Sequence, residues 1–144
     1  MAYEVSVFIE NKVGHLERVT SVLKDAGINI LTMHLNHTAS GWGIVNLLVS
    51  RPEKACLLLT QNGISAALRR IAVLAMDDSP GALDDILKKI ALAGINFTTA
   101  YGRSGHYPGK AWFVIDVNDI PEAEQKMVDS GLGLLPDKTV YAIK

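Results

Sequence analysis

The sequence has one cysteine, a nearly balanced charge and no long apolar run, and each shortage excludes a class of protein. The single cysteine excludes an intramolecular disulfide framework and a zinc site built from several thiolates, and it suits a reducing compartment. A net charge of −1 gives no electrostatic basis for binding nucleic acid or anionic lipid. No stretch approaches the roughly 20 apolar residues of a membrane helix, and the N-terminus opens into a predicted strand rather than a signal peptide. We therefore expect a cytoplasmic protein with neither nucleic acid nor membrane as a partner.

The 144 residues, 49% of them hydrophobic, suffice for one ordinary globular domain or two very small ones. An internal repeat favours two. Gly14 and Gly81 each lie in a turn between an apolar strand and an amphipathic helix, and they are 81 − 14 = 67 residues apart. The segments Gly27-Ile28-Asn29 and Gly94-Ile95-Asn96 have the same spacing, 94 − 27 = 67. A turn, a helix and a following strand that recur at one offset indicate two copies of one folding unit.

The copies are placed at residues 1–68 and 69–144, and the periodicity of each predicts strand, helix, strand, strand, helix, strand. That order, βαββαβ, is typical of a ferredoxin-like unit, in which both helices cover one face of an antiparallel sheet. The expected class is α+β, with two such units in tandem and their sheets joined side by side. The later strands are expected at residues 71–76, 95–102, 111–117, 132–135 and 140–143, and residues 64–68 are expected as a short strand or a connector.

The sheet face without helices should be polar where it meets water. With Val5, Val7 and Ile9 directed to the core, the opposite face instead collects apolar and aromatic residues. These are Phe8, Ile30, Ile44, Leu48, Phe97, Tyr101, Trp112 and Val114. A one-residue slip of register would invert the assignment. Because an apolar surface of this extent is typical of an interface, we expect a homo-oligomer, most simply a dimer.

The repeated turns carry a family resemblance. The second turn, Asp78-Ser79-Pro80-Gly81-Ala82-Leu83, together with Gly94-Ile95-Asn96-Phe97, resembles the signature of ACT domains. The first turn, Asn11-Lys12-Val13-Gly14-His15-Leu16, with Gly27-Ile28-Asn29-Ile30, is similar. The resemblance covers nearly the whole chain as a tandem pair without a catalytic domain. The first copy departs from the second in having Val13 in place of Pro80 and Asn11 in place of Asp78, so the two sites need not be equivalent.

The resemblance implies a regulatory module that binds a small molecule, commonly an amino acid. ACT domains pair side by side through their sheets, and their ligands lie at the junction of two units, near the first strand-to-helix turn and the start of the second strand. The ligand-binding residues that this implies are Asn11, Lys12, Val13, Gly14, His15, Leu16, Asn29, Asp78, Ser79, Pro80, Gly81, Ala82, Leu83 and Asn96. A separate protein regulated by the chain is a further expected partner.

The chemistry of the turns agrees with a small zwitterion. A helix N-terminus offers unpaired N–H groups and positive potential to a carboxylate. Gly14 and Gly81 lack a Cβ, which permits unusual dihedrals and close approach of a ligand. Asn11 and Asp78 can accept hydrogen bonds from an ammonium group. A purely structural interpretation also stands, in which Ser79-Pro80 only starts a helix.

Nothing in the turns indicates catalysis. They contain no nucleophile beside a base, and no phosphate-binding or dinucleotide motif is present. His34 and His37 are three residues apart on a predicted strand, so they point to opposite faces and make a poor metal pair. We expect no catalytic residue, no metal and no cofactor. Two alternatives to a non-enzymatic sensor stay open: a small enzyme on the same fold, and an oligomerisation module without ligand.

Overall fold

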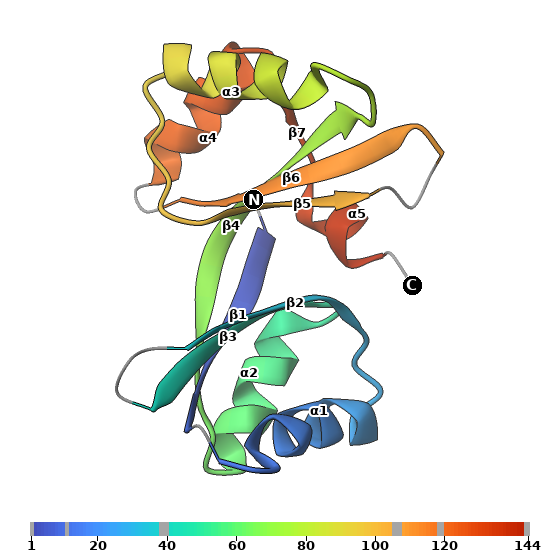
Figure 1. The fold of residues 1–144 in the computed structure, drawn as a ribbon, viewed down its shortest axis with the longest axis vertical. Helices are drawn as coiled ribbons and strands as arrows, with labels where there is room; N and C mark the ends of the chain where they lie inside the picture. The colour runs from blue at the N-terminus through green and yellow to red at the C-terminus, as the bar shows by residue number, and fades with distance from the viewer. Residues whose placement is uncertain (1, 11, 38–40, 105–107, 118–119, 143–144) are drawn as a thin grey trace. The chain divides into compact units, whose positions relative to one another are not determined.

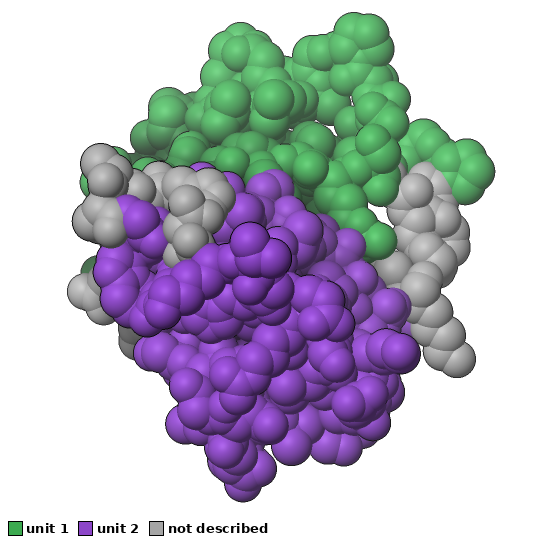
Figure 2. Space-filling model, turned by 60° about the horizontal axis from the view of Figure 1, so that its bottom comes forward, with its two compact units in different colours: residues 1–2, 70–140 green, residues 3–69, 141–144 purple. Residues whose placement is uncertain are grey.

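The structure is a computed structural model that describes residues 2–10, 12–37, 41–104, 108–117 and 120–142. The chain forms two compact units, coloured separately in Figure 2. The first, called the N-terminal unit here, comprises residues 3–69 and 141–144; the other, the C-terminal unit, comprises residues 1–2 and 70–140.

The N-terminal unit is an antiparallel sheet with two helices on one face (Figure 1). Its strands lie in the order β2-β3-β1-β4, with both β1 and β2 antiparallel to β3. The elements are β1 (Ala2–Glu10), α1 (His15–Asp25), β2 (Ile30–His37), β3 (Trp42–Val49), α2 (Pro52–Gln61) and the first part of β4 (Ser65–Asp77).

The C-terminal unit repeats this arrangement. The second part of β4 is its first strand, and the order β5-β6-β4-β7 matches β2-β3-β1-β4 position for position. Its further elements are α3 (Ala82–Leu92), β5 (Ala100–Ser104), β6 (Lys110–Asp116), α4 (Ile120–Asp129), β7 (Gly133–Leu134) and the short α5 (Asp137–Tyr141). The predicted α+β class with two βαββαβ units is therefore confirmed.

The two hydrophobic cores repeat as the sequence does. Val5 and Val7 lie in one core, and Ala72 and Leu74, 67 residues later, lie in the other. The helices follow the same rule, since Val19 and Leu23 of α1 correspond to Ile86 and Ile90 of α3, and all four side chains are buried. Burial of one stripe of each helix against the sheet is the main favourable term for a small unit.

The strand predictions are wrong in three places. Residues 64–68 and 71–76 are not separate strands, because Arg69 and Arg70 continue the extended backbone and join them as β4. Residues 140–143 were expected as a strand, but the chain forms α5 up to Tyr141. This helix begins at Asp137, directly after Pro136. The Pro136 carbonyl accepts hydrogen bonds from the N–H groups of Thr139 and Val140. The last residue of that predicted strand, Ile143, lies outside the described residues.

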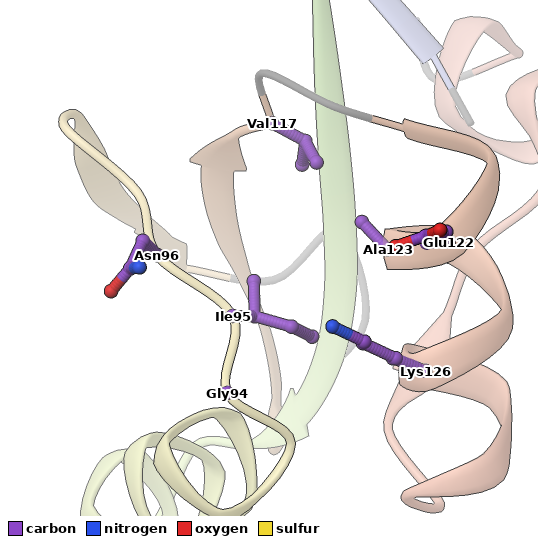
Figure 3. Close-up of a pocket in the computed structure, with 7 residues that line it drawn as sticks. All are labelled: Gly94, Ile95, Asn96, Val117, Glu122, Ala123 and Lys126. Carbon is purple, nitrogen blue, oxygen red and sulfur yellow. The ribbon is translucent and has the colours of Figure 1, made fainter.

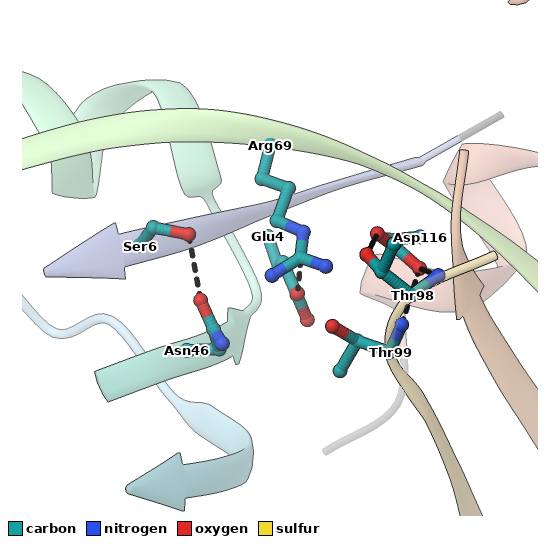
Figure 4. Close-up of polar contacts among 7 residues, drawn as sticks. All are labelled: Glu4, Ser6, Asn46, Arg69, Thr98, Thr99 and Asp116. Atoms are coloured by element: carbon teal, nitrogen blue, oxygen red, sulfur yellow. Dashed lines mark hydrogen bonds and ion pairs between the residues drawn. The ribbon is translucent and has the colours of Figure 1, made fainter. Parts of the chain in front are cut away.

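The third error is the strand expected at residues 95–102, which begins only at Ala100. The cause is the buried carboxylate of Asp116 on β6 (Figure 4). Its Oδ1 accepts the backbone N–H groups of Thr98 and Thr99 at 2.8 and 2.7 Å, and its Oδ2 accepts the Thr98 hydroxyl. A side chain thus takes the place of ladder hydrogen bonds, and the segment before β5 stays irregular.

The sheet face opposite the cores is less apolar than predicted. Ile30 and Phe97 pack against the cores instead. For Ile30 the reason is a register shift at the start of β2, and for Phe97 it is that its segment is not a strand. Polar pairs also occupy this face: Ser6 Oγ donates to Asn46 Oδ1 at 2.6 Å, as Figure 4 shows.

Glu4, on the same face of β1, is buried and lies 3.9 Å from Arg69 (Figure 4). Of the apolar residues predicted here, Leu48 and Val114 are buried within the chain, whereas Phe8 is 44% exposed. The face is therefore mixed in polarity, and much of it is not an open apolar surface.

Helix α2 offers a matched test of the core. Leu59 is fully buried and Leu57 is 58% exposed, two residues away on the same helix. We expect Leu59→Ala to lower the free energy of unfolding by about 2–5 kcal/mol, through lost burial and a residual cavity. Leu57→Ala should change it by less than about 0.5 kcal/mol. Urea unfolding monitored by circular dichroism measures both, and equal losses would contradict the placement of the α2 core face.

Candidate functional site

The two predicted turns have the same backbone geometry. Gly14 and Gly81 are the N-cap residues of α1 and α3, with φ angles of 83° and 88°. Each glycine carbonyl accepts the first helical hydrogen bond at 3.0 Å, from Arg18 and Asp85 respectively. A left-handed φ is readily adopted only by glycine, which explains the residue type.

Glycine also lacks the oxygen with which an N-cap side chain usually satisfies the next amides. Within the described parts of the chain, no side chain caps α1 or α3. A Cβ at Gly14 or Gly81 would meet nothing within 4 Å, so the space over each turn is open. Each helix therefore presents its first-turn amides, at the positive end of its dipole, to an acceptor from outside.

In the first turn, the predicted residues divide into exposed and structural ones. Lys12 is exposed and forms an ion pair with Glu10, and the Val13 side chain is fully exposed. His15 is half-buried, and its Nδ1 accepts the Glu10 N–H at 2.9 Å, which closes the turn. Leu16 packs against the core of the N-terminal unit. Asn11, also predicted here, lies outside the described residues.

The second turn is exposed and is tied to a neighbouring hairpin. The N–H of Asp78 donates to the Gly109 carbonyl at 2.8 Å, and that of Ala82 donates to the Ser79 carbonyl at 3.2 Å. Asp78, Ser79 and Pro80 are exposed, and Leu83 is 45% exposed. The Asp78 carboxylate and the Ser79 hydroxyl therefore stay accessible to a ligand.

A hollow of about 330 Å³ lies beside this second turn. It is lined by Ala75, Met76, Asp77, Ala82, Asp85, Ile86, Lys89 and Lys110. Of these, only Ala82 was predicted from the sequence. Of the charged members, Asp77 ends β4 directly before the turn, and Asp85 and Lys89 come from α3. Lys110 comes from β6, and only the register of β4 and β6 places it opposite Asp77.

Exposed ion pairs set the local electrostatics. Lys110 Nζ lies 2.5 Å from Asp77 Oδ1. The hydrogen bond from this ammonium group, reinforced by its charge, holds the pKa of Asp77 below its ordinary value of 3.8. Lys12 lowers the pKa of Glu10 in the same way, below its ordinary 4.5. Both carboxylates are therefore ionised at neutral pH, which keeps a carboxylate acceptor next to each turn.

The two predicted asparagines lie at the other end of the helices from the glycine turns. Gly81 precedes α3 and Asn96 follows it, and eleven helical residues span about 16 Å. Asn29 has its N–H bonded to Ser50 Oγ and its carbonyl to the Ser50 N–H, both at 3.0 Å. Asn96 is exposed and lines a separate hollow with residues of α4 (Figure 3). One unit alone therefore does not bring a turn and its asparagine together.

In the parts of the chain that the structure describes, no three His, Cys, Asp or Glu side chains gather in a group suited to a metal ion. Across the same residues, none of the helices combines the length and apolar character needed to span a bilayer.

Comparison with known proteins identifies the family. The family model described as "ACT domain pair" matches residues 1–143. The chain belongs to this family. The resemblance seen in the two turns is thereby confirmed, and the ACT domain pair accounts for the repeat of 67 residues. A search of curated proteins found no match.

Solved structures show the same ACT domain pair fold. Protein BT0572 from Bacteroides thetaiotaomicron is 26% identical, with a TM-score of 0.88, and the match covers 98% of this chain and 96% of that one. The ligand-free regulatory subunit of aspartate kinase from Thermus thermophilus is 15% identical, with a TM-score of 0.63 and coverage of 90% and 89%. The corresponding subunit from Thermus flavus is also 15% identical, with a TM-score of 0.57 and coverage of 90% and 92%.

The lowered pKa of Asp77 predicts an acid-sensitive contribution to stability. Because the folded pKa lies below the unfolded one, the Asp77–Lys110 pair stabilises the fold above about pH 4, and this stabilisation disappears as the pH falls through the folded pKa. We expect Lys110→Met to raise the pKa of Asp77 towards 3.8. NMR titration of the Asp77 carboxyl measures the shift. Lys88→Met, which removes the exposed pair with Asp84, is the control and should leave the pKa of Asp77 unchanged.

Proposed function

We propose that this chain is a regulatory protein that binds an amino acid, or a similar small metabolite with a carboxylate, at its two glycine turns. The observation that carries the proposal is that α1 and α3 both begin at a left-handed glycine, and that no side chain in the described part of the chain caps either helix. First-turn amides and the positive helix dipole are complementary to a carboxylate. Membership of the ACT domain pair family supports a regulatory, ligand-binding role over a catalytic one.

The ammonium group of the ligand is proposed to bind the carboxylates and amides around the turns. Asp78 and the neighbouring Asp77 are exposed acceptors for an ammonium group, beside a first helical turn that accepts an anion. A ligand that carries an ammonium and a carboxylate on the same carbon, such as an α-amino acid, matches this pairing. The residues proposed for the two sites are those named in the sequence analysis, from Asn11 to Leu16 and from Asp78 to Leu83, with Asn29 and Asn96.

A complete site is proposed to use two units, because a turn and its asparagine lie at opposite ends of one helix. The two units, at residues 1–68 and 69–144, or copies of them from a second chain, would meet around the ligand. The ligand then favours one arrangement of units over another, and this difference is what a regulated protein partner senses. Homodimerisation belongs to the same proposal, and no catalytic step is required of the chain.

A thermal-shift panel of the twenty amino acids tests the proposal. At least one amino acid should raise the melting temperature, since a ligand at 100 times its Kd adds about 2.7 kcal/mol to the free energy of unfolding. The informative variants are Gly14→Asn and Gly81→Asn. Asparagine tolerates a left-handed φ and places an amide side chain over the open helix end, so the fold should persist while the shift disappears in one or both variants.

The matched control is Gly131→Asn. Gly131 also has a left-handed φ, of 70°, but it follows α4 in the chain and belongs to neither turn. This variant should keep the full ligand response. A panel with no response in the parent protein, or a response that all three variants retain, would contradict binding at the turns.

A further inference from the structure

The repeat gives each residue of the second turn a counterpart in the first, 67 positions earlier. The counterpart of Ala82 is His15, since 82 − 67 = 15. The ring nitrogen Nδ1 of His15 accepts a hydrogen bond from the Glu10 N–H at 2.9 Å. An imidazole ring thus closes the turn of the N-terminal unit at the end of β1. The C-terminal unit has no such ring, because the side chain of Ala82 is a methyl group.

The N–H group that corresponds to that of Glu10 belongs to Asp77, and it has no acceptor in the described part of the chain. Hydrogen bonds to one neighbour alternate along an antiparallel strand, and the next N–H, that of Asp78, donates to Gly109 on the β6 side. The Asp77 N–H is therefore directed to the other edge of β4, at a point where the pairing with β7 has already ended. The hydrogen bond that an imidazole accepts in the first turn is thus left open in the second.

The hollow of about 330 Å³ beside the second turn, called the turn hollow here, lies at this place. Ala82 and Asp77 both line it, and the buried Ile86 and half-buried Met76 give it an apolar wall. The exposed carboxylate of Asp85 also lines it. The turn hollow therefore combines an apolar wall with an open backbone donor and a carboxylate acceptor.

A second difference between the units concerns the residue one turn further along the helix. The counterpart of Asp85 is Arg18, since 85 − 67 = 18. Arg18 Nη2 donates to the carbonyl oxygen of Asn62, the C-cap residue of α2, at 2.6 Å. A carboxylate cannot donate such a bond, and the Asp85 side chain has no ion-pair or hydrogen-bond partner among the described residues. It is therefore available as an acceptor at the turn hollow.

The lining of the turn hollow also bears on the charge of a ligand. Two ammonium groups, of Lys89 and Lys110, balance the two carboxylates of Asp77 and Asp85, so the net charge is 2 − 2 = 0 and gives a cationic ligand no advantage. A neutral imidazole, the major form above about pH 6.5, has one acceptor nitrogen and one donor N–H. The open Asp77 N–H and the Asp85 carboxylate are complementary to this pair.

We infer that the turn hollow binds the imidazole ring of histidine. The ligand ring supplies in the C-terminal unit what His15 supplies in the N-terminal unit. Its unprotonated nitrogen accepts the Asp77 N–H, its N–H donates to Asp85, and its face packs on Ile86 and Met76. A hollow of about 330 Å³ is at the lower end of the roughly 300–1,000 Å³ of small-molecule sites, which suits a free amino acid.

The turn hollow deepens the function proposed for the glycine turns, and it rests on that function only for the backbone of the ligand. The carboxylate and ammonium group of histidine take the places proposed at Gly81 and Asp78. The ring position follows from Asp77 and Ala82 and does not depend on them. One ring site is expected per chain, because His15 already accepts the corresponding N–H in the N-terminal unit.

The test is an NMR titration of the full, ¹⁵N-labelled chain at about pH 7.5, where free imidazole is mostly neutral. The probe is 4-methylimidazole, the side chain of histidine alone. It should cause saturable shifts of the Asp77 and Ile86 amides and leave the Glu10 amide unchanged. Pyrrole, a ring of the same size with an N–H but no acceptor nitrogen, should shift none of them.

Histidine separates the turn hollow from the turn. It should shift the same amides and bind at least about tenfold more tightly than 4-methylimidazole, because its carboxylate and ammonium group add contacts at the turn. Equal affinities would support the turn hollow and count against the glycine turn. Histidine that shifts the amides of Leu83 and Asp84 but leaves that of Asp77 unchanged would overturn the inference and support the turn alone.

Ala82→His should place the protein's own imidazole in the turn hollow, as in the first turn. We expect its Asp77 amide to move downfield without ligand, and 4-methylimidazole to bind at least about tenfold more weakly. Leu87→His, on the same helix but outside the lining, is the control and should bind as the parent does.

A second pair of variants keeps the test valid if Ala82→His does not fold. Asp85→Leu should weaken 4-methylimidazole binding about tenfold through loss of the charged acceptor, whereas Asp84→Leu, the neighbouring carboxylate outside the lining, should not. Absence of saturable shifts in the parent protein, equal binding of pyrrole, or undiminished binding in Ala82→His or Asp85→Leu would each overturn the inference.

Discussion

Both units depend on one backbone constraint, a left-handed residue at the point where the first strand turns into the first helix. Only glycine adopts this φ without strain, and because glycine has no side chain, the same residue supplies no side-chain cap to the helix N-terminus. The missing side chain of glycine thus both permits the left-handed turn and leaves room for a ligand at the proposed site. Duplication of the unit reproduces both at an offset of 67 residues, which is why Gly14 and Gly81 remain equivalent in φ while their neighbours differ.

The neighbours give the two turns unlike surroundings. In the first turn, the His15 side chain accepts a hydrogen bond from the Glu10 N–H. The equivalent residue in the second turn is Ala82, whose side chain cannot form a hydrogen bond. A duplicated unit can therefore keep its core pattern, which packing fixes, and vary the polar groups at helix ends, which contribute little to the fold and decide what can bind.

The repeat, the helices and the core stripes were predictable from the sequence because each follows from local periodicity, as Val19 and Leu23 show with Ile86 and Ile90. The errors arose where distant residues decide local structure. Asp116 removes Thr98 and Thr99 from the expected strand, and no pattern in residues 95–99 reveals a carboxylate some 18 residues later. The pairing of Asp77 with Lys110 likewise depends on register. The turns could be predicted as candidate sites because their residues are contiguous in the sequence. The hollows could not be predicted, because their lining residues come from separate elements.

The central claim is that open first-turn amides of α1 and α3 receive a carboxylate. The most direct measurement is the chemical shift of the backbone amides of Leu16, Glu17, Leu83 and Asp84 as an amino acid that binds the protein is added. The account predicts that the amides of at least one helix move downfield and become protected from hydrogen exchange, because they acquire an acceptor. Saturable binding that leaves all four amides unchanged in shift and in exchange would contradict it.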